Sequence, residues 1–287
     1  MDNTVIAAGA VYLFTRSGDR WEQQAYIKAS NTEPHDELYD EFGASLALSD
    51  EGDALAVGAP GKDASGAVYL FTRSGDRWAE QAYIKAFNAK PVDLFGGSLS
   101  LSSDGKTLMV GARGEDSAST GINGNQDNGS TDAGAIYHFV RDSNGWAEKN
   151  YIKPSSVYSF DLFGNAFALS SNGRTLAARG IYNVGSATNP NPSFVGVFYP
   201  FTIGNDIVTP QDHIQFSTPN TLGTLGVSFA LDGDGSRLAV GVPEESKNTR
   251  RMKIDGNKVN SKVSDTGKTR NSVLSPITVG AVFIYER

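Results

Sequence analysis

The stretch GAVYLFTRSGDRW, residues 9–21, occurs again letter for letter at residues 66–78. A phrase copied within one chain is the sequence signature of a repeat architecture, in which each copy builds one structural unit. Looser copies of its first half follow as GAIYHF at Gly134 and GAVFIY at Gly280. The repeated stretch therefore predicts a fold assembled from several copies of one small unit.

A second phrase precedes each copy and sets the length of the unit. FGASLALSDEGDALAVGAP begins at Phe42, FGGSLSLSSDGKTLMVGAR at Phe95, FGNAFALSSNGRTLAARGI at Phe163 and a weaker LGVSFALDGDGSRLAVGVP at Leu225. We therefore divide the 287 residues, predicted to form one domain, into a leading half-repeat 1–41 and repeats 42–94, 95–162, 163–224 and 225–287.

Each repeat has the pattern of β-strands. Alternating residues in ASLALS, and short apolar runs such as ALAVGAP and GAVYLF between Gly or Pro residues, are typical of strands. Four strands per repeat indicate the blade of a β-propeller. We predict an all-β propeller of four-stranded antiparallel blades, with four to five blades' worth of repeats. Pairing of the N- and C-terminal strands is one way in which the ring could close.

The composition argues against several classes of protein. A net charge of −7 and a pI near 5.0 disfavour nucleic-acid binding, which needs clustered Lys and Arg. The sequence has no apolar run of about eighteen residues, so we expect no membrane insertion. The first residues also lack the basic and apolar segments of a signal peptide.

The repeated phrases resemble the FG-GAP repeats of integrin-α-like β-propellers, in particular their bacterial versions. The resemblance implies a non-enzymatic adhesion or binding module, outside the cell or on its surface, that presents variable loops to a protein or glycan ligand. These loops would be residues 115–133, 182–193 and 244–275. One alternative is a structural subunit of an extracellular assembly or filament that self-associates through its incomplete terminal blades. A propeller hydrolase or lyase is a more distant alternative.

Twelve residues at repeated positions are predicted to build the scaffold. A glycine would enter the crowded innermost strand, a phenylalanine would wedge between blades, an aspartate would accept backbone N–H bonds, and a tryptophan would lie in the core or at the blade edge. For the tryptophans, a stacking surface for sugars is the alternative. These residues are Gly43, Gly96 and Gly164; Phe42, Phe95 and Phe163; Asp40, Asp93 and Asp161; and Trp21, Trp78 and Trp146.

The long loop GEDSASTGINGNQDNGSTDAG, residues 114–134, is the main metal candidate. Its oxygen-bearing side chains match the ligands that Ca²⁺ prefers, although a solvated, turn-rich insertion explains the same letters. The candidate ligands are Asp116, Asn123, Asn125, Asp127 and Asp132. No cofactor other than Ca²⁺ is indicated. A second acidic cluster, residues 35–41, has the same two interpretations.

Enzyme motifs are missing from the sequence. The chain has no Cys, and His35, His138 and His213 stand in unrelated phrases, so neither a Cys-His pair nor a His-rich metal site can be assembled. We therefore expect no catalytic residues and no enzyme activity. A carboxylate pair formed by residues of different blades at the propeller axis stays open at this stage.

Overall fold

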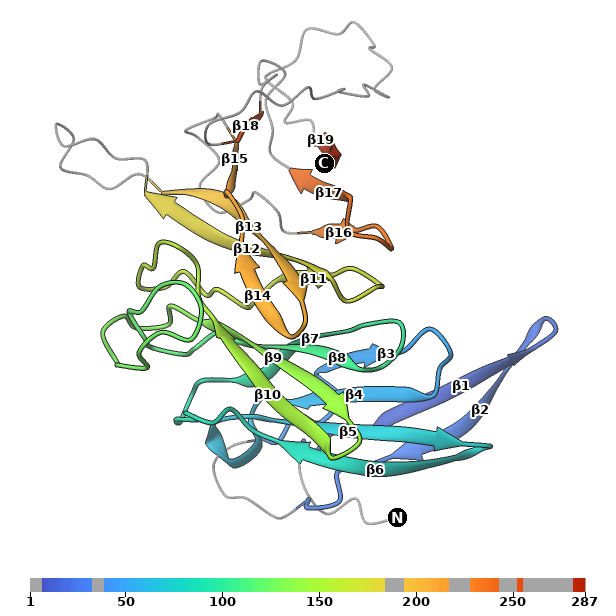
Figure 1. The fold of residues 1–287 in the computed structure, drawn as a ribbon. Helices are drawn as coiled ribbons and strands as arrows, with labels where there is room; N and C mark the ends of the chain where they lie inside the picture. The colour runs from blue at the N-terminus through green and yellow to red at the C-terminus, as the bar shows by residue number, and fades with distance from the viewer. Residues whose placement is uncertain are drawn as a thin grey trace, which may run out of the picture. The chain divides into compact units, whose positions relative to one another are not determined.

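The computed structural model describes residues 7–32, 39–183, 194–216, 228–242, 252–254 and 281–286 (Figure 1). The chain forms two compact units, each of which is considered by itself below. The first comprises Met1–Asn165 with Asn205–Ile207, and the second comprises Ala166–Gly204 with Val208–Arg287. The break after Asn165 lies close to the predicted start of the third repeat at Phe163.

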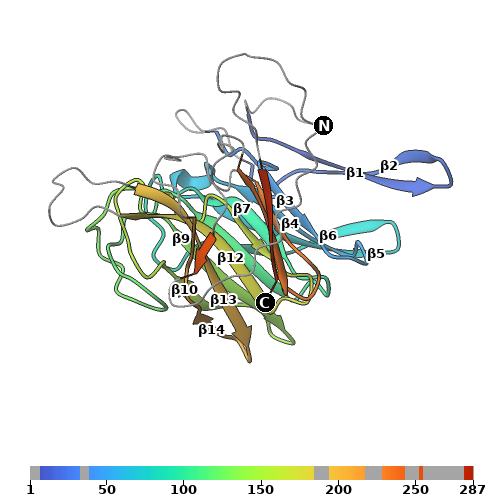
Figure 2. The same cartoon turned by 90° about the horizontal axis from the view of Figure 1, so that it is seen from above.

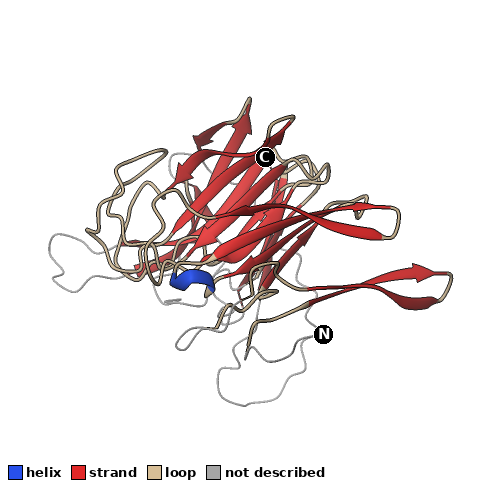
Figure 3. Ribbon diagram, turned by 90° about the horizontal axis from the view of Figure 1, so that it is seen from below, coloured by secondary structure: helices blue, strands red, loops and turns tan. Residues whose placement is uncertain are grey.

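The first unit contains two complete blades and a hairpin. Its strands are β1 (Val11–Ser17), β2 (Arg20–Ile27), β3 (Ser45–Leu48), β4 (Ala54–Ala59), β5 (Ala67–Ser74), β6 (Arg77–Ile84), β7 (Phe95–Leu101), β8 (Thr107–Ala112), β9 (Ala135–Asp142) and β10 (Gly145–Ile152). The sheets β3-β4-β5-β6 and β7-β8-β9-β10 are antiparallel and follow chain order, while β1 and β2 pair as a separate hairpin. Figure 3 shows the strands with one short 3₁₀ helix, Lys62–Ala64. The predicted four-stranded antiparallel blades are confirmed for repeats 42–94 and 95–162.

The second unit holds the two later repeats. Its strands are β11 (Phe167–Leu169), β12 (Thr175–Asn183), β13 (Phe194–Gly204), β14 (Ile207–Pro210), β15 (Ile214–Phe216), β16 (Phe229–Leu231), β17 (Arg237–Val242), β18 (Met252–Ile254) and β19 (Ala281–Glu286). One sheet has the order β11-β12-β13-β15-β18 with β14 on β13, and the other has the order β16-β17-β19.

Two of the predicted variable loops lie mostly beyond the described residues. Residues 184–193 are outside them, and of residues 244–275 the structure describes only strand β18. The acidic cluster at 35–41 is described only from residue 39. No helix in the described part of the chain is long and apolar enough to cross a membrane.

Phenylalanine wedges join neighbouring sheets of the first unit. The buried ring of Phe42 lies 5.2 Å from Tyr69 and 6.2 Å from Phe71 of its own blade, in a cluster that includes Val11 and Ile27 of the preceding hairpin. Phe95 repeats this arrangement at the next junction, 5.3 Å from Tyr137 and 6.0 Å from Phe139. Phe163 is also buried. Phe42 and Phe95 thus occupy equivalent positions at the first two junctions.

The glycine after each wedge is required by a close backbone approach. Gly96 has φ of +88°, and a Cβ atom there would lie 2.5 Å from the carbonyl oxygen of Ala67. Gly164 has φ of +84°, and its Cβ atom would lie 2.2 Å from the carbonyl oxygen of Ala135. Only glycine adopts such a conformation in so little space without strain. The crowding comes from the third strand of the preceding sheet. Gly43 occupies the same position with φ of +97°.

The repeated aspartates and tryptophans differ from copy to copy. Asp40, Asp93 and Asp161 are all buried. Asp93 Oδ2 accepts the predicted backbone bond, from Lys90 N at 2.7 Å, whereas Asp40 Oδ2 contacts Lys62 Nζ at 3.3 Å. Trp78 and Trp146 pack against the clusters between sheets, but Trp21 is 67% exposed.

Candidate functional site

The candidate site lies along β10, the outer strand of the second complete blade. The register between β9 and β10 shifts between Glu148 and Asn150, which leaves Lys149 as a bulged residue. A β-bulge re-aims the side chains around it and is common beside functional sites. Glu148, Lys149, Asn150 and Tyr151 consequently line one hollow, although they are consecutive in the strand.

The insertion 114–134 docks against this strand. Asn123 N donates to Tyr151 O, and Tyr151 N donates to Asn123 Oδ1, both at 2.8 Å. Ile122 forms an isolated antiparallel bridge with Ile152, so the loop pairs with the outer edge of the sheet at this point. This contact fixes one wall of the hollow.

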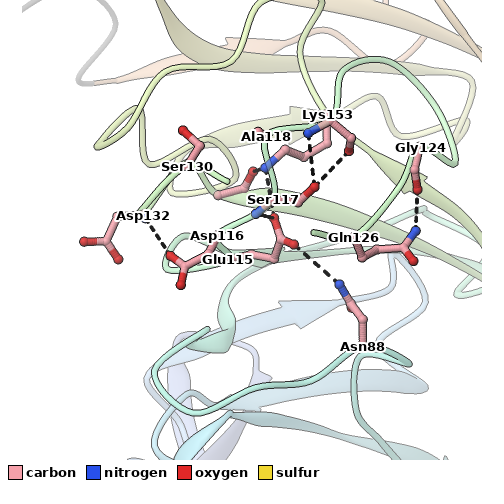
Figure 4. Close-up of polar contacts among 12 residues, drawn as sticks. Asn88, Glu115, Asp116, Ser117, Ala118, Gly124, Gln126, Ser130, Asp132 and Lys153 are labelled. Atoms are coloured by element: carbon pink, nitrogen blue, oxygen red, sulfur yellow. Dashed lines mark hydrogen bonds and ion pairs between the residues drawn. The ribbon is translucent and has the colours of Figure 1, made fainter. Parts of the chain in front are cut away.

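A buried ion pair ties both ends of the same loop to the end of β10. Lys153 Nζ lies 2.9 Å from Glu115 Oε2 and donates to the carbonyl oxygen of Gly134 at 2.7 Å (Figure 4). Glu115 also accepts hydrogen bonds from Ser117 N and from Asn88 Nδ2, at 3.1 and 3.5 Å. Both charged groups are almost fully buried, so each needs these partners to offset the loss of its hydration.

Two of the five predicted calcium ligands use their carboxylates to hold the loop's own backbone. Asp116 Oδ1 accepts from Asp132 N at 2.8 Å, and Asp127 Oδ1 accepts from Ala118 N at 3.0 Å (Figure 4). The carbonyl oxygen of Asn125 accepts from Ser117 Oγ at 2.7 Å, while Asn123 contacts β10. Within the described ranges, no three His, Cys, Asp or Glu side chains are grouped to hold a metal ion. Calcium binding by this loop stays a prediction.

The hollow has a volume of about 290 Å³. It is lined by Phe87, Asn123, Gln126, Glu148, Lys149, Asn150 and Tyr151. The Phe87 and Tyr151 rings meet edge to face, with centroids 6.2 Å apart and planes at 89°. Three amides, one carboxyl and one ammonium group therefore line one hollow together with two aromatic rings, a combination typical of small-molecule sites.

Burial changes the protonation of the groups around the hollow. It raises the pKa of Glu148 to about 7, against a smaller opposite effect of the hydrogen bond from the backbone N–H of Phe87. Burial lowers the pKa of His138 to about 4. The His138 ring lies under the site, with Nδ1 3.0 Å from Asn150 Nδ2, and is neutral near pH 7. Asp206 lies 3.7 Å from the Lys149 ammonium. Glu148 is therefore the group here that changes charge near neutral pH.

Sequence reasoning singled out Asn123 but missed most of the site. Two of the missed residues stand where this repeat departs from its copies: His138 replaces Leu13 and Leu70, and Asn150 replaces Ala25 and Ala82. Glu148 and Tyr151, in contrast, match Glu80 and Tyr83 of the preceding repeat. A polar side chain at a position that is apolar in the other copies was the available signal. Phe87 shows the reverse change, an aromatic residue where the preceding copy has Ser30.

Comparison with known proteins identifies the repeat. Residues 21–71 match the family described as FG-GAP repeat. This segment spans the first wedge at Phe42 and the junction between β2 and the first complete blade. The chain is a β-propeller with an FG-GAP repeat. A search of curated protein sequences finds no match to this propeller.

Solved structures similar to this propeller include TolB from Acinetobacter baumannii, with 15% identity and a TM-score of 0.37 over 83% of this chain and 43% of that one. Sqt1 from Saccharomyces cerevisiae has 8% identity and a TM-score of 0.40, over 79% and 54% of the two chains. The periplasmic gluconolactonase of Pseudomonas aeruginosa has 15% identity and a TM-score of 0.35, over 86% and 72%. The propeller thus spans about half the length or less of the first two.

These matches correct the expected function. The sequence resemblance implied an adhesion or binding module for protein or glycan contacts, with an assembly subunit as the alternative. The similar structures are instead TolB and gluconolactonase propellers, and at such low identity only the fold is common to them and this chain. The expectation was wrong because the residues that carry the resemblance, such as Phe42, Gly43 and Gly58, pack the blades together and say nothing of a ligand.

Proposed function

We propose that this propeller binds a small molecule carrying a carboxylate in the hollow beside β10. The observation that supports the proposal is the gathering of Lys149, a readily protonated Glu148 and three side-chain amides beside the Phe87 and Tyr151 rings. A volume of about 290 Å³ lies at the lower end of small-molecule sites, which favours a compact ligand.

The charged groups favour a carboxylate as the polar end of the ligand. The Lys149 ammonium is partly exposed and shares its charge with Asp206 at 3.7 Å, so a ligand oxygen can approach it. Protonated Glu148 is a hydrogen-bond donor, whereas the ionised form would repel a carboxylate. Its pKa of about 7 provides the protonated form at and below neutral pH.

The rings favour an apolar or planar body for the same ligand. Phe87 is 59% exposed, which leaves part of its surface available for contact. Aromatic rings stack on or meet edge to face with other planar groups. A ligand with a flat body and one carboxylate would contact both parts of the hollow.

Binding without turnover is part of the proposal, in keeping with the absence of enzyme motifs from the sequence. Glu148 and Lys149 are adjacent in one strand, and the neutral ring of His138 lies buried beneath Asn150. A location outside the cell, supported by the resemblance to FG-GAP propellers, is also a proposal. Detection of the chain in the extracellular fraction of its source would test it.

Calorimetric titration of the full chain with benzoate tests the proposal, with benzamide as the neutral ligand of matching shape. We expect benzoate to bind more tightly, and the Lys149→Gln variant to lose this preference. Lys106→Gln, a change in the turn between β7 and β8, is the matched control and should behave like the wild type. Equal affinity for the two ligands, or unchanged benzoate binding by Lys149→Gln, would contradict the proposal.

A further inference from the structure

Two amide side chains that line the hollow have their orientation fixed by backbone groups. Asn150 Nδ2 lies 2.7 Å from the carbonyl oxygen of Asp206, which can only accept a hydrogen bond, so the NH₂ end of the Asn150 amide points there. Asn123 Oδ1 lies 2.8 Å from the backbone N–H of Tyr151, which can only donate, so the oxygen end of the Asn123 amide points there. Neither amide can turn over without bringing two oxygens or two N–H groups together.

The buried ring of His138 adds a second restraint on Asn150. The two residues are partners in the register of β9 and β10, which Figure 2 shows side by side. Asn150 Nδ2 lies 3.0 Å from His138 Nδ1. Because burial keeps the ring neutral near pH 7, Nδ1 can accept the second amide hydrogen, and the ring proton is then on Nε2. Both N–H bonds of the Asn150 amide are therefore occupied.

The oxygen is the end of the Asn150 amide that can still bind a ligand. From the described part of the chain it accepts one hydrogen bond, which Asn123 Nδ2 donates at 3.4 Å. This bond is weak, because its length exceeds the usual N–H···O distance of about 2.7–3.2 Å. Asn123 and Asn150 both line the hollow, so Asn150 Oδ1 and Asn123 Nδ2 are an adjacent acceptor and donor in its wall.

The third amide of the hollow also directs its NH₂ group into the protein. Gln126 Nε2 donates to the carbonyl oxygen of Gly124 in the same loop (Figure 4). Its Oε1, to which no donor among the described residues bonds, is a second acceptor. Lys149 and protonated Glu148 are donors instead. The hollow thus combines donors that suit a carboxylate with amide oxygens that need a hydrogen-bond donor from the ligand.

We propose that the ligand of this hollow carries a hydroxyl group as well as its carboxylate, and that Asn150 is the residue that selects the hydroxyl. The inference rests on the proposed binding of a carboxylate beside Lys149. A hydroxyl group both donates and accepts, so it can donate to Asn150 Oδ1 and accept from Asn123 Nδ2 in place of their long mutual bond. A hydroxy-substituted aromatic carboxylate has all three parts that the hollow favours: the carboxylate, the flat body and the hydroxyl.

Calorimetric titration of the full chain at pH 6 with meta- and para-hydroxybenzoate tests the inference. The corresponding fluorobenzoates are the matched ligands, because they are similar in size but cannot donate. We expect at least one hydroxybenzoate to bind about three- to tenfold more tightly than its fluoro analogue, the usual gain from one hydrogen bond. In Asn150→Ala this ratio should fall to about one, because the acceptor is lost. Asn144→Ala, in the turn between β9 and β10 and outside the lining of the hollow, should keep the wild-type ratio.

A second variant guards against a failure of Asn150→Ala to fold, which thermal unfolding would show. The double variant of Asn150→Ala with His138→Leu restores the leucine and alanine that pair at these two positions in the earlier copies of the repeat. It should also lose the preference for the hydroxyl.

The outcomes separate this inference from the proposed function. A wild-type chain that binds benzoate more tightly than benzamide, but gains nothing from the hydroxyl, would overturn this inference alone. A preference for the hydroxyl that persists in both variants would place its recognition elsewhere and would also overturn the role of Asn150. If none of these ligands binds, the proposed function fails together with this inference.

Discussion

The pH dependence of ligand binding follows from the protonation of Glu148. Its pKa of about 7 means that the carboxyl is about 90% protonated at pH 6 and about 10% protonated at pH 8. If a carboxylate ligand binds only the protonated form, the apparent dissociation constant increases in inverse proportion to the protonated fraction. Benzoate should therefore bind about tenfold more weakly at pH 8 than at pH 6, since its own carboxylate is ionised at both.

Calorimetric titrations at several pH values between 6 and 8 measure this effect. His138 does not contribute, because burial lowers its pKa to about 4, and burial raises the pKa of Tyr151 above its ordinary value. The Glu148→Gln variant keeps a hydrogen-bond donor and cannot ionise, so its affinity should be the same at pH 6 and pH 8. A wild-type affinity that does not change with pH, or an unchanged tenfold dependence in Glu148→Gln, would refute the role of Glu148.

Three stability measurements test the packing of the blades. Gly96→Ala should lower the free energy of unfolding by about 2–4 kcal/mol, because it adds both backbone strain and atomic overlap. Gly75→Ala should cost only about 1 kcal/mol, because Gly75 also has a positive φ but no atom lies near its Cβ position. Equal losses for the two variants in urea titrations would argue against the close approach at Gly96. Glu115→Ala should cost about 3–5 kcal/mol by leaving Lys153 buried and unpaired, and the double variant with Lys153→Met should recover much of this; no recovery would show that the ion pair is not the cause. Burial raises the pKa of Asp93 to about 6, so the contribution of this carboxyl to stability is full below pH 4 and falls by about 2–3 kcal/mol as the pH rises through 6. Asp93→Asn should therefore be more stable than the wild type at pH 8. A variant that is less stable than the wild type at pH 8 would contradict the raised pKa of Asp93.

The blade scaffold could be predicted from the sequence because its packing rules are local and repeated. The same Phe-Gly pair begins each of the first two complete repeats, and the structure places Phe42 and Phe95 in equivalent wedges. The glycine requirement was also predictable from the expected crowding, although the group that causes the crowding was not. The crowding at Gly96 comes from the carbonyl oxygen of Ala67, in strand β5 of the preceding blade. No spacing in the sequence reveals this contact.

The candidate site could not be predicted in the same way, because several of its residues depart from the repeat. Asn150 and His138 stand at positions that are apolar in the other copies, and the loop residue Asn123 reaches β10 only after the insertion has folded onto the sheet edge. The same loop suggested calcium from its composition. The carboxylates of Asp116 and Asp127 accept hydrogen bonds from the loop's backbone, and calcium binding stays a prediction.

Residues at the same position of the repeat can differ in burial, which the sequence does not predict. Trp21 and Trp78 share one repeated phrase, yet one is exposed and the other packs between sheets. The difference depends on whether another sheet covers the hairpin. Sequence predicted the shared position, while the surroundings of each copy decide its burial.

An NMR titration of the ¹⁵N-labelled full chain with benzoate at pH 6 would most directly test whether the hollow beside β10 is a binding site. We predict saturable shifts of the backbone amides at residues 123–126 and 148–151, with Phe87, and little change at the exposed turn around Gly75. Shifts that do not saturate, or that gather elsewhere while these amides stay fixed, would contradict the proposed site.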